Sequence, residues 1–304
     1  MANDETATLQ ESELLVVKSQ PITSHLRTTI QYLRARAGFF SRFRGWGVAL
    51  VYGILHSLLT NALTSILPAV DSSIPYLSAV LSAVLLARLQ LTWTHVVISE
   101  PSTKSWFRRR PDLKSWVKII PATALWATAE QLTVALPTVL HDIFGLARWS
   151  QDPSAIGDAD EATRKMIVMQ SFAVFAVAIG TAVLVLVPAT ATLRRVQASL
   201  LPDEDEAIVP FDRTFDGNVV PEIVGGTGKL GVVDAWRSFE WAARVRLLKV
   251  YVKTFAMEVA VTALFVGIMF AEVHLIMGDE LQKLMKAAQA SQNGEAFYEI
   301  EGIN

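Results

Sequence analysis

The 304-residue chain contains no cysteine. Disulfide bonds, thiolate metal sites and cysteine nucleophiles are therefore excluded, and cysteine usage does not indicate a redox compartment. Charged residues are also scarce, at 18% of the chain, compared with roughly 25% in soluble domains. Because the formal net charge is only −2, no overall electrostatic field attracts nucleic acid or an acidic substrate.

Patterns of catalytic and ligand-binding sites are missing as well. The five histidines have no metal-ligand spacing, and no serine stands in the context of a catalytic triad. The segment GGTGK at residues 225–229 lacks the earlier glycine and the following Ser or Thr of a phosphate-binding loop, so we interpret it as a flexible loop. We predict a protein that is not an enzyme and has no metal or cofactor.

Apolar residues are abundant, at 52% of the chain, and they are gathered into long runs. Five runs have the length of a membrane span: 47–67, 76–99, 119–143, 166–187 and 250–276. The predicted fold is an all-α, integral membrane bundle of about five transmembrane helices. The second span carries small residues that would let a neighbouring helix approach closely, namely Ser78, Ala79, Ser82 and Ala83.

Basic segments with interspersed aromatic residues lie at 24–45, 101–118 and 232–247 and lead into the first, third and fifth spans. They predict three amphipathic helices on the membrane surface. The same composition could suggest nucleic-acid binding, but membrane anchoring accounts better for segments that adjoin spans. We therefore predict contact with the lipid bilayer, no nucleic-acid partner, and an N-terminus on the inner face with the C-terminus opposite.

The remaining segments are polar. Residues 1–22 are predicted to be a flexible acidic tail, 23–277 the transmembrane domain with a polar loop at 202–229, and 278–304 a polar C-terminal tail. The acidic start resembles neither a secretory signal nor an Arg-rich mitochondrial presequence, so targeting information is expected within the spans.

The arrangement of a basic segment followed by a span occurs three times. Aligned without gaps, the first, third and fifth spans place basic residues at their entrances (Arg44, Lys118 and Arg246) and ionisable residues near their middles (His56, Glu130 and Glu258). An ionisable side chain at the bilayer centre costs at least a few kcal/mol and normally faces a cavity or a partner. The pattern predicts a degenerate threefold repeat around a polar groove.

Two alternatives remain open for the groove residues. Arg88, near the middle of the second span, and Glu130 could form a structural ion pair, or they could line a groove that handles polar substrates. His56 could line the same groove, or it could make a hydrogen bond between packed helices.

Two segments carry a family resemblance. GFFSRFRGW at 38–46, with Gly38, Arg44 and Gly45, resembles the glycine, spacer, aromatic-basic-glycine motif that follows the surface helix in the mitochondrial carrier family. PATATLRRVQ at 188–197, with Pro188, Arg195 and Gln197, resembles the proline signature that ends odd-numbered helices in that family. The resemblance covers residues 24–276 and implies a carrier-like bundle in a mitochondrial membrane.

The chain also departs from the family pattern. A carrier has six spans, so the first odd-numbered helix and its proline signature are missing here, and Thr190 stands where the family has an acid. In the family, such acids and their basic partners form the salt-bridge networks that close the cavity alternately to each side. Their loss implies a polar groove open to lipid, similar to divergent carrier-like proteins of the mitochondrial outer membrane that act in membrane-protein insertion or fusion.

We therefore expect a non-enzymatic protein that acts in membrane-protein insertion or membrane organisation, with the outer mitochondrial membrane slightly favoured over the inner. The expected groove residues are Arg88, Glu130, Glu258 and His56, and the expected partners are the bilayer and client membrane proteins. The alternative is a solute transporter of the carrier type that has kept a central binding site, with a partner helix or a second copy completing the bundle.

Overall fold

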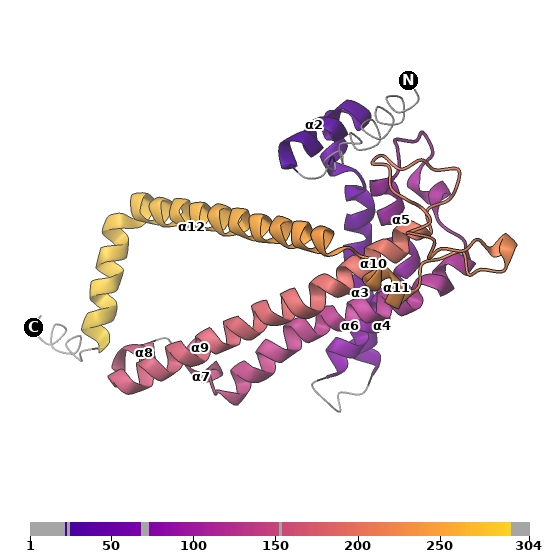
Figure 1. Ribbon diagram of the computed structural model, residues 1–304. Coiled ribbons are helices and arrows are strands. Elements are labelled where there is room, and N and C mark those ends of the chain that lie inside the picture. Colours follow the sequence, from indigo (N-terminus) through magenta and orange to yellow (C-terminus); the bar gives the residue numbers. More distant parts are fainter. Residues whose placement is uncertain (1–21, 23–24, 68–72, 152–153, 293–304) are drawn as a thin grey trace, which may run out of the picture. The chain divides into compact units, whose positions relative to one another are not determined.

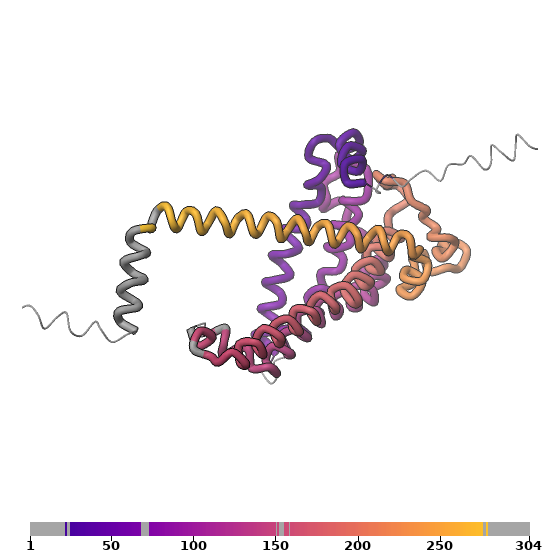
Figure 2. The backbone as a smooth tube through the Cα atoms, turned by 60° about the vertical axis from the view of Figure 1, so that its left-hand side comes forward, coloured from indigo at the N-terminus to yellow at the C-terminus, as the bar shows by residue number. Residues whose placement is uncertain are grey.

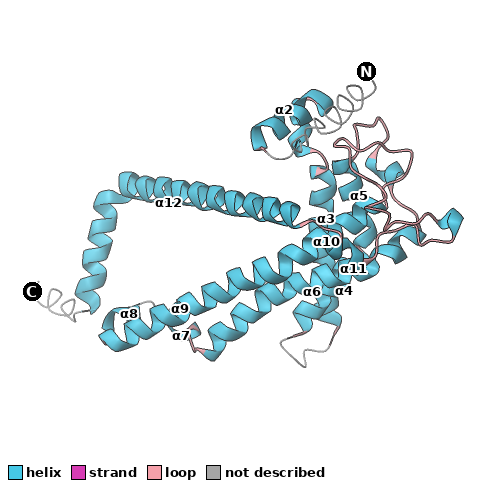
Figure 3. Ribbon diagram, viewed as in Figure 1, coloured by secondary structure: helices cyan, strands magenta, loops and turns pink. Residues whose placement is uncertain are grey.

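A computed structural model describes residues 22, 25–67, 73–151 and 154–292 and shows a helical protein (Figures 1 and 3). Within these ranges the only extended pairing is an isolated bridge between Ser99 and Ala207, so the predicted all-α class is confirmed. Apart from residue 22, the predicted N-terminal tail lies outside the described residues, as do residues 293–304 of the predicted C-terminal tail.

The helices follow one another along the chain. They are α2 (Leu26–Ala37), α3 (Trp46–Ile66), α4 (Ile74–Leu85), α5 (Ala87–Ile98), α6 (Leu113–Ile143), α7 (Ala147–Gln151), α8 (Ser154–Asp158), α9 (Glu161–Thr181), α10 (Val187–Ser199), α11 (Val232–Arg237) and α12 (Trp241–Gln292). Short 3-10 turns occur at Phe39–Phe43, Trp106–Arg109 and Glu222–Val224, and a π turn at Ala182–Leu186 joins α9 to α10. Pro188 accounts for that π turn, because its ring would clash with the carbonyl four residues earlier in a regular helix.

Four continuous helices are long and apolar enough to cross a membrane: Phe39–Ile66, Leu113–Ile143, Glu161–Ser199 and Trp241–Leu275. They contain the first, third, fourth and fifth predicted spans. The second predicted span is not one straight helix, because α4 and α5 meet at an angle of 58°. Within the described residues the count is therefore four candidate spans, or five when the bent pair is taken as one span.

Two side-chain hydrogen bonds join the bend at Leu86 to a later part of the chain. The indole Nε1 of Trp116, on α6, donates to the carbonyl of Val84 at 3.1 Å, an oxygen that also accepts from the backbone N–H of Leu86. Arg88, two residues beyond the bend, donates from Nε to the carbonyl of Pro111 at 2.6 Å. Both contacts join the bend to the start of α6.

Helix α6 is the centre of the bundle, and it packs against α4, α5, α9 and α10. Figures 1 and 2 show α6 lying alongside the continuous rod of α9 and α10. The four small residues of α4 are all buried where α4 meets α3 and α6. Close helix approach at Ser78, Ala79, Ser82 and Ala83 is therefore confirmed.

The polar loop at 202–229 is packed against one end of the bundle (Figure 3). Phe215 from this loop and Leu230 just after it are buried in a cluster with Leu91, Ile119 and Leu193. The segment predicted to be a flexible loop is held by hydrogen bonds: the amide of Gly228 bonds to the carbonyl of Val220, and Lys229 Nζ to that of Lys118. The loop forms part of the main apolar core, a role that its polar composition did not predict.

The three basic segments have different structures. The first contains a separate surface helix, α2, whereas the second contains only the turn Trp106–Arg109 before α6 begins. The third contains the six-residue α11, and its last residues already belong to α12. A separate α-helix is therefore present in the first and third segments, the third only six residues long, whereas the second segment has a 3-10 turn before the span begins.

The chain divides into two compact units at Phe239. The first contains every helix from α2 to α11. The second contains α12, a helix of 52 residues that has no buried residue along its apolar stretch.

Candidate functional site

Tyr52, His56 and Glu130 form a polar group between apolar helices, here called the α3–α6 cluster. The ring of His56 stacks on that of Tyr52 with centroids 5.6 Å apart, and its Nε2 lies 3.2 Å from the carbonyl oxygen of Ala79 on α4. Glu130 lies halfway along α6 and interacts electrostatically with both His56 and Tyr52. All three side chains are half-buried.

The carboxylate of Glu130 makes no hydrogen bond and no ion pair within the described part of the chain. The hydroxyl oxygen of Tyr52 is buried, and the described residues offer it no hydrogen-bond partner either. A buried polar atom without a partner costs free energy, and a carboxylate in an apolar setting costs more. The cluster therefore has unused capacity to bind a polar or cationic group.

A second polar group, the α5–α10 network, is centred on the buried side chain of Gln197. Its Oε1 accepts hydrogen bonds from Thr94 Oγ1 at 2.7 Å and from Arg194 Nη1 at 2.9 Å. Its Nε2 donates to Gln90 Oε1 at 3.3 Å, and its backbone carbonyl lies 3.0 Å from His95 Nε2. These bonds hold α10 against α5, and every polar atom of the Gln197 side chain is used in them.

Trp93 lies between the cluster and the network. Its ring centroid is 6.4 Å from that of Tyr52, and the Arg194 guanidinium lies over the Trp93 ring, 5.3 Å from its centroid. Arg194 also acts electrostatically on Tyr52. Polar and aromatic side chains thus form a continuous line through the bundle from Glu130 on α6 to Gln197 on α10.

Only two of the four predicted groove residues lie together. His56 and Glu130 come together as expected, and His56 is also in hydrogen-bond range of a neighbouring helix, which was the alternative interpretation. Arg88 does not pair with Glu130; it lies just after the bend and bonds to Pro111 at the start of α6. Glu258 is exposed on α12, in the other compact unit.

The segment at 38–46, the first of the two that carry the family resemblance, leads into α3. Gly38 and Gly45 have φ angles of +78° and +75°, conformations that favour glycine. A Cβ at Gly45 would lie 2.9 Å from both Trp93 Cδ1 and Val97 Cγ2. Arg44 donates from Nη2 to the carbonyl of Val96 at 3.0 Å, so the segment before α3 is joined to the end of α5.

The segment at 188–197, the second that carries the family resemblance, lies in α10. Pro188 is in its first turn, and Gln197 is the centre of the α5–α10 network. Arg195 donates to Ser238 Oγ at 2.8 Å, and its guanidinium lies over the rings of Phe215 and Phe239. This motif therefore connects α10 to α5, to the polar loop and to the residues after α11.

Sequence reasoning missed Tyr52, Trp93 and Arg194, and it missed Gln90 and Thr94 as partners of Gln197. One signal was present: Gln90 and Thr94 are four residues apart, which places these two polar side chains on the same face of a helix. In comparisons with known proteins, no protein family, no curated protein and no solved structure matches this chain.

Proposed function

We propose that this is a non-enzymatic, carrier-like membrane protein of mitochondria that assists the insertion of other membrane proteins or organises the membrane. The observation that supports the proposal is Glu130, a half-buried carboxylate in the middle of a membrane-length helix that has no ion-pair partner within the described ranges. His56 and Tyr52 lie beside it. Together these groups offer a polar contact inside an apolar bundle.

The physical role follows from the cost of moving a polar side chain into lipid. A lysine or arginine at the centre of a membrane span costs about 2.5–3.5 kcal/mol on insertion scales. A carboxylate reached from the lipid side would lower that cost while the client helix enters the bilayer. The imidazole and the phenol would provide further hydrogen bonds to polar groups of the client.

The proposal can be tested with the purified protein in liposomes and a single-span client that carries one mid-span lysine. Insertion is measured by protease protection of the client. We expect Glu130→Gln to lower the insertion rate about tenfold, because the lost charge-assisted contact is worth roughly 1.4 kcal/mol. A client without the lysine should be much less affected.

The matched control is Asp142→Asn, which removes an exposed carboxylate near the end of the same helix. Equal insertion by wild type, E130Q and D142N would refute the role of Glu130. Saturable exchange of a small metabolite that E130Q abolishes would instead support the solute-transporter alternative.

The membrane and the orientation are tested by protease accessibility of tags at both termini, in intact and selectively ruptured mitochondria. We expect the C-terminal tag to be cut in intact organelles and the N-terminal tag only after rupture of the outer membrane. If the C-terminal tag is cut only after outer-membrane rupture, and the N-terminal tag only once the inner membrane opens, the protein lies in the inner membrane.

A further inference from the structure

The loop from α5 to α6 and the first turns of α6 carry many basic side chains. Residues 104–118 include six of them and only one acid, Asp112, which caps α6 by accepting from the amide of Ser115. Three of the six basic residues have a carboxylate within ion-pair distance: Lys104, Arg109 and Lys118. Within the part of the chain that the structure describes, the other three have none. They are here called the basic patch: Arg108, Arg110 and Lys114.

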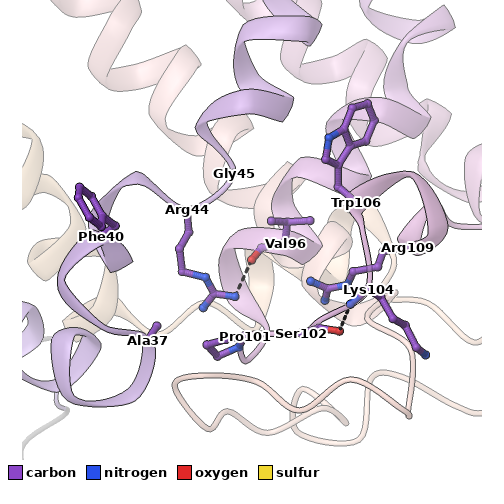
Figure 4. Close-up of a pocket in the computed structure, with 10 residues that line it drawn as sticks. All are labelled: Ala37, Phe40, Arg44, Gly45, Val96, Pro101, Ser102, Lys104, Trp106 and Arg109. Carbon is purple, nitrogen blue, oxygen red and sulfur yellow. Dashed lines mark hydrogen bonds between the residues drawn. The ribbon is translucent and has the colours of Figure 1, made fainter.

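The basic patch is on the surface of the first unit. Its three residues are all exposed, and so are two apolar side chains among them, Phe107 at 59% and Leu113 at 65%. Figure 4 shows part of the same loop, in which the guanidinium of Arg109 points inward toward Arg44, whereas Lys104 points outward. Lys104 adds to the surface charge, because its carboxylate partner is 3.9 Å away and largely exposed. Such a surface attracts negatively charged groups.

Opposite charge is present in the same chain, near its N-terminus. Residues 1–17 contain four acids and no basic side chain: Asp4, Glu5, Glu11 and Glu13. Leu9 stands between the two acidic pairs, as Phe107 stands beside the basic residues of the patch. Residues 4–13, here called the acidic segment, lie outside the described residues. The charge and the apolar content of the acidic segment both complement those of the basic patch.

The acidic segment is attached to the chain close to the patch. Figure 1 shows α2 at the same end of the first unit as the loop that follows α5. The last turn of α2 is held there by the ion pair of Arg36 with Glu100, at 2.8 Å. Helix α2 has 12 residues and is therefore about 18 Å long, whereas residues 14–24 extend to at most about 36–40 Å. The acidic segment can therefore reach the patch, which begins eight residues after Glu100.

We propose that the acidic segment of the chain docks on its own basic patch. Exposed ion pairs are individually weak, but a tether of this length gives an effective concentration in the millimolar range, so several weak pairs act together. The docked segment covers the patch. A partner with an acidic surface must therefore displace the segment before it can bind there.

The test uses the full-length protein in phosphatidylcholine nanodiscs that hold one copy each. Because the chain contains no cysteine, Thr8→Cys in the acidic segment and Leu113→Cys beside the patch can be linked by a short bismaleimide without background. We expect a crosslink within one chain. Neutralising the four acids (D4N, E5Q, E11Q and E13Q) should lower its initial rate about tenfold, the loss expected for several exposed ion pairs together. Raising the salt concentration should also slow it, because the Debye length falls from about 10 Å at 0.1 M to about 3 Å at 1 M.

Reversing the patch with R108E, R110E and K114E should slow the crosslink at least as much as neutralising the acids. The matched control makes the same change of net charge beyond the other end of α6, at three exposed residues, with R148E, R164E and K165E, and it should leave the rate unchanged.

Combining the reversed patch with D4K, E5K, E11K and E13K should restore the crosslink, which a misfolded variant would not do. The proposal is wrong if neutralising the acids has no effect, or if the reversed patch and the control give equal rates. It is also wrong if the crosslink disappears once phosphatidylglycerol is included in the nanodiscs, because the bilayer then occupies the patch.

Discussion

Gly45 is a residue at which a single added methyl group should clearly destabilise the bundle. Its φ of +75° is strained for any side chain, and a residue held in that region costs about 1–3 kcal/mol. The added Cβ would also lie 2.9 Å from Trp93 Cδ1 and 2.9 Å from Val97 Cγ2. Overpacking of this kind costs about 1–3 kcal/mol.

The two neighbours of Gly45 are restricted in different ways. The Trp93 ring is near both the Tyr52 ring and the Arg194 guanidinium, and Val97 is a β-branched residue with a restricted χ1 angle. Because the two costs add, we expect Gly45→Ala to lower the free energy of unfolding by about 2–6 kcal/mol.

Gly47→Ala is the comparison variant, since a Cβ at Gly47 has no neighbour within 4 Å and the residue lies within α3. Replacing a helical glycine by alanine stabilises a helix by roughly 0.5–1 kcal/mol, so G47A should be as stable as the wild type or slightly more stable. Both variants are measured by reversible unfolding in the same detergent. Equal stability of G45A and G47A would refute the reasoning.

Three further predictions concern polar contacts, two of them between helices and one within the polar loop. Gln197→Leu should destabilise the fold by about 2–4 kcal/mol, because it removes the three side-chain hydrogen bonds that join Gln197 to Thr94, Arg194 and Gln90, and unfolding in detergent measures this. Trp116→Phe should cost about 0.5–1.5 kcal/mol by removing the indole hydrogen bond to the Val84 carbonyl, and hydrogen exchange near the bend should rise. The Asp212 carboxylate accepts hydrogen bonds from Thr214 and from the backbone amide of Asp216, which lowers its pKa. The stabilisation that the ionised Asp212 carboxylate gives the loop is therefore fully present above the pKa that Asp212 has in the unfolded chain. It is lost as the pH falls through the lower pKa of the folded protein. Hydrogen exchange of the loop amides, divided by their intrinsic rates, should therefore be faster in acid than at neutral pH. Asp212→Asn should remove this dependence on pH.

The helical class and the positions of the spans could be predicted because long apolar runs depend only on local sequence. Close packing of α4 could be predicted for a similar reason, since Ser78 and Ser82 are one helical turn apart and both are small. The bend at Leu86 could not be predicted. Neither proline nor glycine occurs there, and the groups that stabilise it, Trp116 and the Pro111 carbonyl, come from a later segment.

The site was predicted only in part. An ionisable residue in an apolar run is visible in the sequence, which is how His56 and Glu130 were found. The partners of such a residue are not visible, because they depend on helix rotation and on tilt. Arg88 illustrates this, since the bend two residues earlier turns it toward Pro111. The polar loop was misjudged for the same reason: Phe215 enters the core through contacts that composition does not record.

The α5–α10 network has a consequence for how the chain is assembled during synthesis. Thr94 leaves the ribosome 103 residues before Gln197, its hydrogen-bond partner. During that interval Gln90 and Thr94 have no glutamine to bind, and entry of α5 into lipid would leave them unpaired. We expect α5 to stay at the bilayer surface, hinged at Leu86, until α10 has been made. Cross-linking of stalled nascent chains to lipid should then report late burial of α5 and early burial of α3.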